Sequence, residues 1–502
     1  MKKLSLLVGG LLLSSMVHAT NYGLVVGCCG KYETLDKNLK GTTNDAKAFA
    51  STLSRGCAKK NITLLIDKDS TKEKIKANLK RLEKILEPDD RLYFYFSGHG
   101  ARAGDKKVFM KEIENDDDLN KRLDKTALVT YNYNSKDAYN TALITAEDLQ
   151  PVFKRLDDRG VKIIMFADAC FAGESFRSTA SDRMKRLENA QMRKVKQPKS
   201  TKTEYKNLIF FGASLNSQQA REIDTKYGKR GEFSLYLEYC LDNGDSNGDK
   251  KISKDELNLC MINEFPSYAS ESSVYPTRRL GASSLLGAKV VNHKRDRTLP
   301  KVKYSGKINL TGIATLVKNG YELEVVSNGN EYEIFKADAP YVTVEKKQLA
   351  RYLKAYRLFA LKSGGSLKIK VKSNSTGKME DTYCAGELIN INVQNMRKEH
   401  QMIVLTLDRN GKVIILKSRG NFAQTEVFPP YNGVDKVKVF TFNNQDTYKK
   451  VLDYQNTNAG VLSSPNVNTL YELLSKEQTL RGQGLSIRTT SNTIKQCVNG
   501  AR

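Results

Sequence analysis

A histidine and a cysteine each follow an apolar run of this sequence, and together these two residue types can attack a carbonyl group. His99 stands between two glycines after RLYFYFS, and Cys170 follows VKIIMFADA. A thiol beside an imidazole can be deprotonated and attack a carbonyl carbon, while the imidazole protonates the leaving amine. Taken singly, Cys170 could be a buried core thiol and His99 a hydrogen-bonded turn residue. The presence of both favours the chemical interpretation.

Five short apolar segments are expected to form the strands that position these residues. They are YGLVVGC, NITLLI, RLYFYF, VKIIMFA and NLIFFGA, and each is nearly continuous, as in strands that are buried on both faces. Segments with helical spacing lie between them, such as TTNDAKAFASTL and TKEKIKANLKRLEKIL. This alternation predicts an α/β fold with a mostly parallel sheet flanked by helices. His99 and Cys170 would then lie beyond the carboxyl ends of strands, where ligands bind in such sheets.

The chain is long enough for two or three domains, and it carries a large excess of positive charge. Its 502 residues include 82 Lys and Arg against 56 Asp and Glu, a formal net charge of +26. Acidic partners are therefore worth considering, although charge alone identifies none and no nucleic-acid partner is expected. Residues 177–206 contain ten basic and three acidic residues and are expected to form an exposed loop.

The first residues predict export. A basic start, MKK, is followed by the apolar LSLLVGGLLLSS and by Val17-His18-Ala19, which together indicate a signal peptide over residues 1–19. The apolar stretch is too short to span a bilayer, and no later segment is long enough. We therefore expect a periplasmic or secreted protein without a membrane span.

Eight cysteines follow the predicted signal peptide, and an oxidising compartment permits disulfides. Cys170 is expected to stay a free thiol. Up to three bridges, of undetermined connectivity, are available to Cys28, Cys29, Cys57, Cys240, Cys260, Cys384 and Cys497. Two histidines outside the candidate site, His293 and His400, have no ligand-like neighbours in sequence and are interpreted as surface residues.

The two strand ends resemble those of the caspase-like clan of cysteine peptidases. SGHG combined with DAC is most similar to metacaspases and bacterial caspase-like proteins, and FGAS at 211–214 and GEFS at 231–234 are also similar. The resemblance implies a caspase-like peptidase domain over residues 20–290. It further implies that Cys170 is the nucleophile and His99 the general acid/base of a cysteine-type endopeptidase. The backbone N–H groups of Gly100 and Cys170 would form its oxyanion hole.

Three further residues are expected to bind the substrate. Asp168 resembles the acid of the first specificity pocket of metacaspases, Asp45 matches a second acid of that family, and Ser97 would lie beside them. Two carboxylates select a cationic side chain, so we expect protein or peptide substrates with Arg or Lys before the scissile bond. Asp45 could equally cap or stabilise the N-terminus of a helix. Thr42 stands where many relatives have a cysteine.

The segment DSNGDKKISKDE has the spacing of an EF-hand calcium loop. The expected Ca²⁺ ligands are Asp245, Asn247, Asp249, the Lys251 carbonyl, Ser253 and Glu256. Lys250 occupies the position where glycine is usual, and it would need a left-handed backbone. The alternative is an ordinary polar turn.

Beyond about residue 299 the pattern changes to alternating strands with Asn-Gly turns, which predicts a β-rich accessory region over 300–502. One helical segment, VEKKQLARYLKAYRLFAL, interrupts it. The part around 366–445 is similar to a sandwich-like domain that many bacterial caspase-like proteins carry. It contains no expected catalytic residue and indicates binding or positioning.

Two functions of different classes remain. The first is an exported cysteine endopeptidase that cleaves after Arg or Lys and is assisted by calcium. Its segment 177–206 is either cleaved by the enzyme itself or is a surface loop that is never processed, and the sequence does not decide between the two. The second is a non-catalytic caspase-like scaffold that binds partners through its basic loop and accessory region. A scaffold has no need of the His99 and Cys170 pair, so the sequence favours the enzyme.

Overall fold

The computed structural model describes residues 19–29, 38–102, 126–133, 141–169, 205–213, 220–245, 249–265, 299–304, 306, 309–318, 321–361, 367, 369–375, 382–427, 433–457 and 460–496. Cys170, Asn247 and nearly all of the predicted signal peptide lie outside the described residues. The same holds for His293, Cys497 and the basic segment 177–206 apart from its last two residues.

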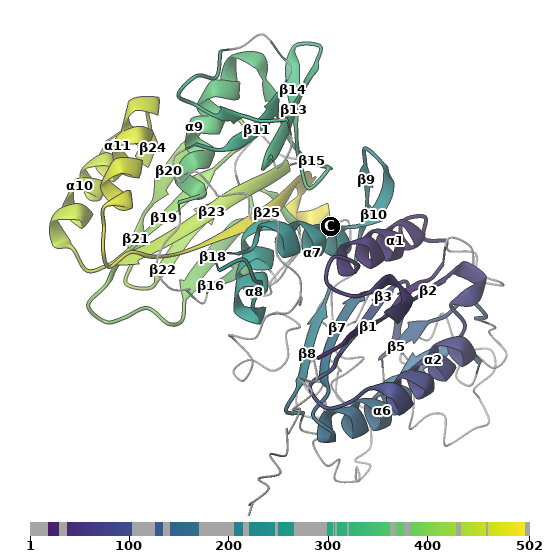
Figure 1. The fold of residues 1–502 in the computed structure, drawn as a ribbon. Helices are drawn as coiled ribbons and strands as arrows, with labels where there is room; N and C mark the ends of the chain where they lie inside the picture. The colour runs from purple at the N-terminus through teal and green to yellow at the C-terminus, as the bar shows by residue number, and fades with distance from the viewer. Residues whose placement is uncertain are drawn as a thin grey trace, which may run out of the picture.

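Five parallel strands form the central sheet of the N-terminal half of the chain (Figure 1). They are β1 (Asn21–Gly27), β2 (Ile62–Ile66), β3 (Arg91–Ser97), β7 (Lys162–Asp168) and β8 (Leu208–Gly212), in the order β2-β1-β3-β7-β8. All four neighbouring pairs are parallel, which confirms the predicted sheet. The edge strand β2 is less buried than predicted, because Leu64 is 38% exposed.

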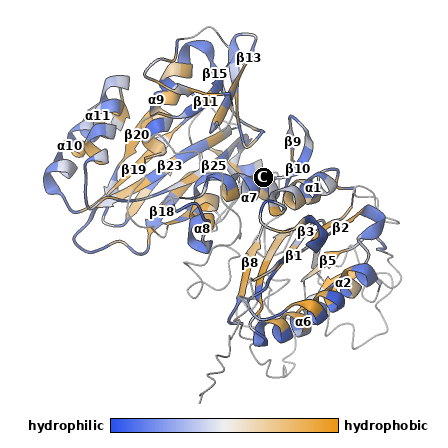
Figure 2. Ribbon diagram, viewed as in Figure 1, coloured by the Kyte–Doolittle hydropathy of each residue, from blue (hydrophilic) through white to orange (hydrophobic). Residues whose placement is uncertain are grey.

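Helices cover both faces of this sheet, as the alternation of segments predicts. They are α1 (Thr42–Leu53), α2 (Lys72–Ile85), α6 (Ala146–Asp158), α7 (Glu232–Asn243) and α8 (Lys254–Glu264). Successive residues of β3 point to opposite faces. Phe94 packs against Phe153 of α6 with ring centroids 5.9 Å apart, and Tyr95 stacks on Phe49 of α1 at 4.3 Å. Figure 2 shows the apolar strands of the sheet and the mixed hydropathy of α2 and α6, which is typical of amphipathic helices.

Smaller elements extend the domain on the side of the strands' carboxyl ends. An antiparallel sheet contains β4 (Gly100–Arg102), β5 (Thr126–Val129) and β6 (Leu143–Thr145). A hairpin of β9 (Glu222–Thr225) and β10 (Gly228–Gly231) leads directly into α7. Short 3₁₀ turns, η1 (Lys59–Asn61) and η2 (Asp67–Asp69), flank β2. The sequence analysis identified none of these elements.

The C-terminal region is β-rich, as predicted, and contains three sheets. The first has the order β12-β11-β13-β14-β15, with β11 (Lys301–Tyr304), β12 (Thr315–Leu316), β13 (Leu323–Asn328), β14 (Glu331–Lys336) and β15 (Ala339–Glu345). The second has the order β16-β18-β22-β21, with β16 (Ile369–Ser373), β18 (Leu388–Val393), β21 (Ser418–Arg419) and β22 (Phe422–Glu426). The third has the order β17-β25-β23-β19-β20-β24, with β17 (Thr382–Ala385), β19 (Gln401–Leu407), β20 (Val413–Leu416), β23 (Gly433–Phe442), β24 (Val461–Leu462) and β25 (Arg481–Thr493).

The second and third sheets pack face to face, with residues such as Ile391, Val404 and Val439 in one shared core. The helices of this region are α9 (Leu349–Phe359), preceded by η5 (Lys346–Gln348), and α10 (Gln445–Asn456), α11 (Ser464–Ser475) and α12 (Ile494–Gln496). Only α9 was expected, and it is shorter than predicted because its first residues continue β15.

Two disulfides join described cysteines. Cys240 of α7 is bonded to Cys260 of α8, and Cys28 is bonded to Cys29 directly after β1. Cys384 is also disulfide-bonded, whereas Cys57 is a buried free thiol.

The interpretation of His400 as a surface residue is wrong. Its side chain is buried, and Nδ1 lies 3.4 Å from the hydroxyl oxygen of Thr441. The residue directly precedes β19 in the sandwich, and packing of the two sheets buries its side chain. The neighbouring residues in the sequence do not indicate this burial.

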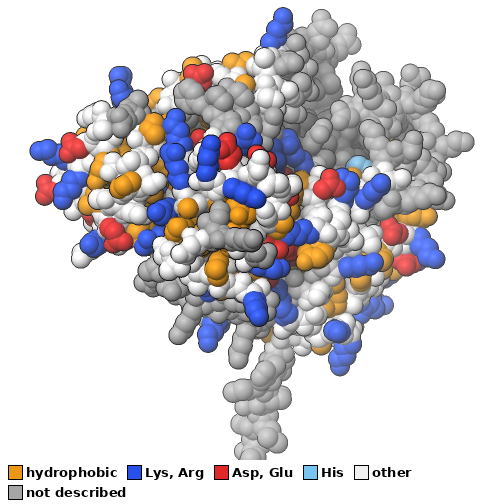
Figure 3. Space-filling view, turned by 90° about the horizontal axis from the view of Figure 1, so that it is seen from above, with side chains coloured by type: hydrophobic (Ala, Val, Ile, Leu, Met, Phe, Trp, Pro, Cys, Tyr) orange, Lys and Arg blue, Asp and Glu red, His pale blue; other side chains and the backbone are white. Residues whose placement is uncertain are grey.

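No helix in the described parts of the chain combines the length and the apolar character that crossing a membrane requires. Figure 3 shows one face of the molecule, on which Lys and Arg side chains are scattered among Asp and Glu rather than gathered in one patch.

The bridge between α7 and α8 should contribute measurably to stability. It closes a loop with a sequence separation of 20, so replacing both Cys240 and Cys260 with Ser should lower the free energy of unfolding by about 3 kcal/mol. Thermal and urea denaturation of the purified protein would measure this. Cys57→Ala, which breaks no bridge, is the matched control. Equal transition midpoints for the double variant and the wild type would contradict the expectation.

Candidate active site

The carboxyl ends of β1, β3 and β7 meet at one edge of the central sheet. Ser97 pairs with Gly27 on one side and with Asp168 on the other. The strand pairing continues beyond the last strand residues, because the N–H of Gly98 donates to the Asp168 carbonyl at 3.1 Å and that of Cys28 donates to the Ser97 carbonyl at 2.7 Å. Residues that follow β3 and β7 therefore leave the sheet side by side.

The residue before His99, Gly98, occupies a position that only glycine can take. A Cβ on Gly98 would overlap the carbonyl oxygen of Cys28 and lie 2.8 Å from the ring of Phe96. The carbonyl of His99 accepts the N–H of Val129 at 2.9 Å, and Gly100 then begins β4. His99 is partly buried, held between the parallel sheet and the small antiparallel one.

The predicted nucleophile, Cys170, lies outside the described residues. The last described residue before it is the buried Ala169, directly after β7. Because β7 neighbours β3, the chain reaches Cys170 from the same edge of the sheet that carries His99 and Gly100. The dyad and the oxyanion hole stay predictions from the sequence.

The three predicted substrate-binding residues, Asp45, Ser97 and Asp168, lie together and are all buried. Ser97 donates its hydroxyl to Oδ2 of Asp45 at 3.0 Å. Asp45 lies in the first turn of α1, so the sequence analysis was correct to consider a helix N-terminus for it. Its contacts, however, are with other elements of the fold and do not cap α1.

The start of α7 holds both carboxylates. The N–H of Gly231 lies 2.9 Å from Oδ2 and 3.1 Å from Oδ1 of Asp45. The N–H and hydroxyl of Ser234 both donate to Oδ2 of Asp168, at 3.0 and 2.5 Å. Gly231 fits between the two acids only because it lacks a side chain, since a Cβ there would overlap Asp168 and lie 2.9 Å from Asp45. The two acids are therefore joined through one helix turn.

An arginine that the sequence analysis missed completes the arrangement. Arg230 of β10 donates from Nε to Oδ1 of Asp45 and from Nη2 to Glu238 of α7, each at 2.6 Å. We call Asp45, Asp168, Glu238 and Arg230 the acid cluster. It contains three carboxyl groups and one guanidinium group.

Burial controls the ionisation of the acid cluster. Burial and the nearby Asp45 raise the pKa of Asp168, and the hydrogen bonds from Ser234 offset only part of this shift. Burial also raises the pKa of Asp45, against the lowering effect of Arg230, and burial raises the pKa of Glu238 to about 7. Burial alone would lower the pKa of Arg230, but Glu238 and Asp45 raise it, so the guanidinium stays charged.

The carboxylates of Asp45 and Asp168 differ in the number of oxygen atoms that accept hydrogen bonds. Both oxygens of Asp45 accept hydrogen bonds within the protein, from Ser97, Arg230 and Gly231. Among the described residues, the hydrogen bonds to Asp168 reach only Oδ2. Asp168 Oδ1 therefore differs from both oxygens of Asp45, because no hydrogen bond from the described residues reaches it.

The described part of the predicted calcium loop includes Lys250, which occupies the position where glycine is usual. Lys250 has a φ of 65°, the left-handed conformation expected at this position. The N–H of Lys250 donates to Asp245 at 3.0 Å, and the N–H of Lys251 donates to Asp249 at 2.8 Å. These contacts form a tight turn.

The ends of the loop carry two buried acids, Asp245 and Glu256. Ser253 donates its N–H and hydroxyl to Glu256 at 3.0 and 2.9 Å, which forms the capping box of α8. No group of three or more His, Cys, Asp and Glu side chains suited to a metal lies within the described residues, which exclude Asn247. Oxygen atoms of carboxylates, hydroxyls and carbonyls are the kind of ligand that Ca²⁺ takes, so the calcium site stays a prediction from the sequence.

Comparison with known proteins agrees with this fold. Residues 22–178 match the family model for the metacaspase, peptidase C14 domain. Protein GSU0716 from Geobacter sulfurreducens is similar at 16% identity and a TM-score of 0.32, over 48% of this chain and 88% of that one. Caspase-1 from Spodoptera frugiperda is similar at 12% identity and a TM-score of 0.30, over 49% of this chain and 77% of that one. No curated protein matches the chain.

The TM-scores are too low for these two structures to carry an argument, so the assignment rests on the family match and on the strand order. The matched segment includes β1, β3 and β7, with His99, Cys170 and two residues of the acid cluster. Residues 22–178 therefore match the metacaspase, peptidase C14 domain, and the parallel sheet to which they contribute has a caspase-like fold.

Proposed function

We propose that this protein is an exported cysteine endopeptidase that cleaves after Arg or Lys and is assisted by calcium. One observation supports this most directly. The ends of β3 and β7 are paired neighbours, with His99 after one and residue 170 after the other, and the buried acid cluster borders the same edge. A non-catalytic scaffold would not need this combination.

The proposed reaction uses groups of this chain alone. The thiolate of Cys170 attacks the scissile carbonyl carbon, and the backbone N–H groups of Gly100 and Cys170 stabilise the oxyanion. The His99 imidazolium then gives its proton to the leaving amine, and a thioester to Cys170 forms. Water, deprotonated by His99, hydrolyses this thioester, which releases the carboxylate product and restores the thiol.

The composition of the acid cluster supports a cationic residue before the scissile bond. Three carboxyl groups face one guanidinium group, which leaves unbalanced negative potential even with Asp45 paired to Arg230. A substrate ammonium or guanidinium group at Asp168 Oδ1 would supply the missing charge through a charge-assisted hydrogen bond. An aspartate before the scissile bond would be repelled.

The observed disulfides support the proposed export. Bridges such as Cys240–Cys260 are stable in oxidising compartments and rare in the cytosol. A signal peptide over residues 1–19 would direct the chain to such a compartment.

Removal of either member of the dyad should abolish catalysis. Cys170→Ala and His99→Ala should each reduce hydrolysis of Arg- and Lys-terminated reporter peptides to background, with the melting temperature unchanged. Cys57→Ala removes another thiol and should keep full activity, which makes it the control. If the chain cleaves itself within 177–206, Cys170→Ala should remain one intact polypeptide in mass spectrometry. Full activity of Cys170→Ala would overturn the assignment in favour of another nucleophile, and an inactive wild type would favour the scaffold.

The acid cluster should give the specificity a pH dependence. The pKa of Asp168 is raised by burial and by Asp45, so Asp168 gains its proton at higher pH than an ordinary aspartate does. As the pH falls, kcat/KM for an arginine reporter should therefore decrease relative to that for a citrulline reporter, the neutral isostere. The ratio removes the pH dependence of the dyad itself.

Asp168→Asn should lower the arginine-to-citrulline ratio by roughly tenfold or more at neutral pH, because a hydrogen bond between charged groups is lost. The ratio should also become nearly independent of pH in this variant. An unchanged ratio in Asp168→Asn, or a wild-type preference for neutral or acidic residues, would contradict the proposed specificity.

Calcium should stabilise the folded protein through the loop between α7 and α8. We expect a higher melting temperature in millimolar Ca²⁺ than in chelator, because a ligand that binds only the folded state stabilises it. Glu256→Gln should remove most of this difference. Asp255→Asn is the control, since Asp255 is a neighbouring acid whose carboxylate pairs with Lys254 at 3.1 Å. Identical melting temperatures of the wild type in calcium and in chelator would rule out the site.

A further inference from the structure

The C-terminal region contacts the peptidase domain on the elements that hold the acid cluster. We call β9, β10 and α7 the pocket frame, because they supply Arg230, Gly231, Ser234 and Glu238. The pocket frame lies beyond the segment that matches the metacaspase domain, which ends at residue 178. Its outer side faces strands of the C-terminal sheets (Figure 1).

The first contact is an ion pair at the start of α7. Glu232, the first residue of the helix, is only 1% exposed, and its Oε1 pairs with the guanidinium of Arg488 on β25. Gly231 precedes Glu232 and donates its N–H to Asp45, and Ser234 follows it and donates its N–H to Asp168. One helix turn therefore binds the acid cluster on one side and the C-terminal region on the other.

The second set of contacts holds the hairpin. The Nζ atom of Lys226, in the turn between β9 and β10, lies 2.5 Å from Glu324 of β13 and 4.1 Å from the ring centroid of Phe335 on β14. Before the hairpin, Arg221 donates from Nη2 to the hydroxyl of Thr382 on β17 at 3.0 Å. Both ends of the hairpin that carries Arg230 are thus attached to C-terminal strands.

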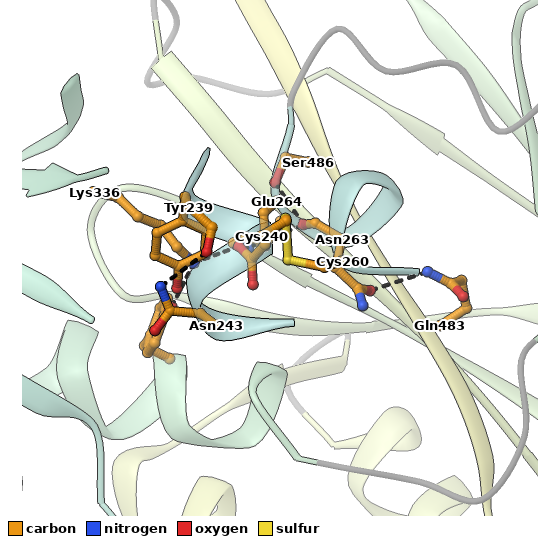
Figure 4. Close-up of a disulfide and its surroundings, with 11 residues drawn as sticks. Tyr239, Cys240, Asn243, Cys260, Asn263, Glu264, Lys336, Gln483 and Ser486 are labelled. Atoms are coloured by element: carbon orange, nitrogen blue, oxygen red, sulfur yellow. Dashed lines mark hydrogen bonds and ion pairs between the residues drawn. A yellow bond between two sulfur atoms is a disulfide. The ribbon is translucent and has the colours of Figure 1, made fainter. Parts of the chain in front are cut away.

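The third set of contacts reaches α7 through its disulfide (Figure 4). Cys240 near the end of α7 forms a disulfide with Cys260 of α8. Asn263, near the end of α8, forms hydrogen bonds with β25. The side-chain oxygen of Asn263 accepts hydrogen bonds from Gln483 at 3.0 Å and from the N–H of Gly484 at 2.8 Å. Its carbonyl accepts the hydroxyl of Ser486 at 3.1 Å.

A buried charge cluster strengthens this third attachment. Glu264, the last residue of α8, pairs with Lys336 of β14 and with Lys436 of β23, the second at 2.9 Å. Burial alone would raise the pKa of Glu264, but the two lysines hold it well below its usual range. Lys336 also donates to the hydroxyl of Tyr356 at 2.7 Å. The two ion pairs of Glu264 join α8 to the C-terminal region, so separation of the two parts would leave buried charges unpaired.

We propose that the C-terminal region positions the acid cluster by holding the pocket frame at both ends, with Arg488 as a positioning residue for substrate binding. This inference rests on the proposed function, because it assigns a role to the C-terminal region in recognition of the cationic substrate residue. Arg488 pairs with Glu232, and among the described residues no hydrogen bond or ion pair joins it to the acid cluster.

Loss of Arg488 would act on the acid cluster through the first turn of α7. The buried Glu232 carboxylate would lose the guanidinium of Arg488, which would disfavour its present position. Movement of this carboxylate would loosen the N–H groups of Gly231 and Ser234, which fix Asp45 and Asp168. Substrate binding should suffer more than the chemical steps, since β3 and β7 do not depend on this turn.

Arg488→Gln tests the inference with two independent measurements on the full-length protein. Hydrogen exchange followed by mass spectrometry should show roughly threefold or more faster exchange in peptides that contain residues 231–235. The KM for an arginine reporter should rise by a similar factor with kcat nearly unchanged. Arg481→Gln is the matched control on β25, because Arg481 donates to the carbonyl of Asn395 within the C-terminal region. Arg488→Lys, which keeps the charge, should restore part of both effects.

Glu324→Gln provides a second test if Arg488→Gln folds poorly, because it removes a carboxylate partner of Lys226 at the far end of the pocket frame. This variant should show faster hydrogen exchange at residues 222–231 and a higher KM for the arginine reporter, as expected for Arg488→Gln. Unchanged exchange at 231–235 in a folded Arg488→Gln, or faster exchange with an unchanged KM, would overturn the inference. The exchange measurement needs no catalysis, so failure of the proposed peptidase activity would be recognised separately.

Discussion

Two buried carboxylates of like charge lie close together at the edge of the sheet, and much of the surrounding structure offsets the cost of this arrangement. Asp45 comes from α1 and Asp168 from β7, and burial of both without partners would be strongly unfavourable. The first turn of α7 supplies Gly231 and Ser234, and β10 supplies Arg230. The N-terminus of a helix suits this purpose, because its free N–H groups and dipole favour negative charge. The pocket frame is therefore coupled to the sheet by electrostatics as well as by packing.

The central sheet could be predicted from sequence because its strands are buried on both faces and read as short apolar runs. His99 and Asp168 could be located because Asp168 ends β7 and His99 comes two residues after β3. The partners of the acids could not be found in this way. Arg230 lies 185 positions from Asp45, and Ser234 lies 66 positions from Asp168, so no local pattern connects them. The hairpin that carries Arg230 is polar on both faces and lacks the alternation that signals a strand. Helix α10 was missed because its buried face includes Thr447 and Gln455 beside a single valine.

The contacts between the C-terminal region and the peptidase domain could not be predicted from the sequence for a related reason. Lysine is ordinarily an exposed residue, yet the side chain of Lys336 is completely buried against Glu264, 72 positions away. Burial lowers the pKa of Lys336 to about 8 even though Glu264 raises it. Such a cluster contributes less to stability than to the choice of one docking geometry, because each charge has few alternative partners in the interior. The interface thus specifies orientation between two parts of the chain.

The segment that matches the metacaspase domain ends at residue 178 and includes Asp45 and Asp168. The turn that holds these two acids, with Gly231 and Ser234, lies in a later stretch of the chain. Under the proposed function, mutations in the hairpin or in β25 would alter substrate binding without altering His99 or Cys170. Two relatives could therefore match over residues 22–178 and still cleave different substrates, because the contacts that hold the acid cluster lie later in the sequence.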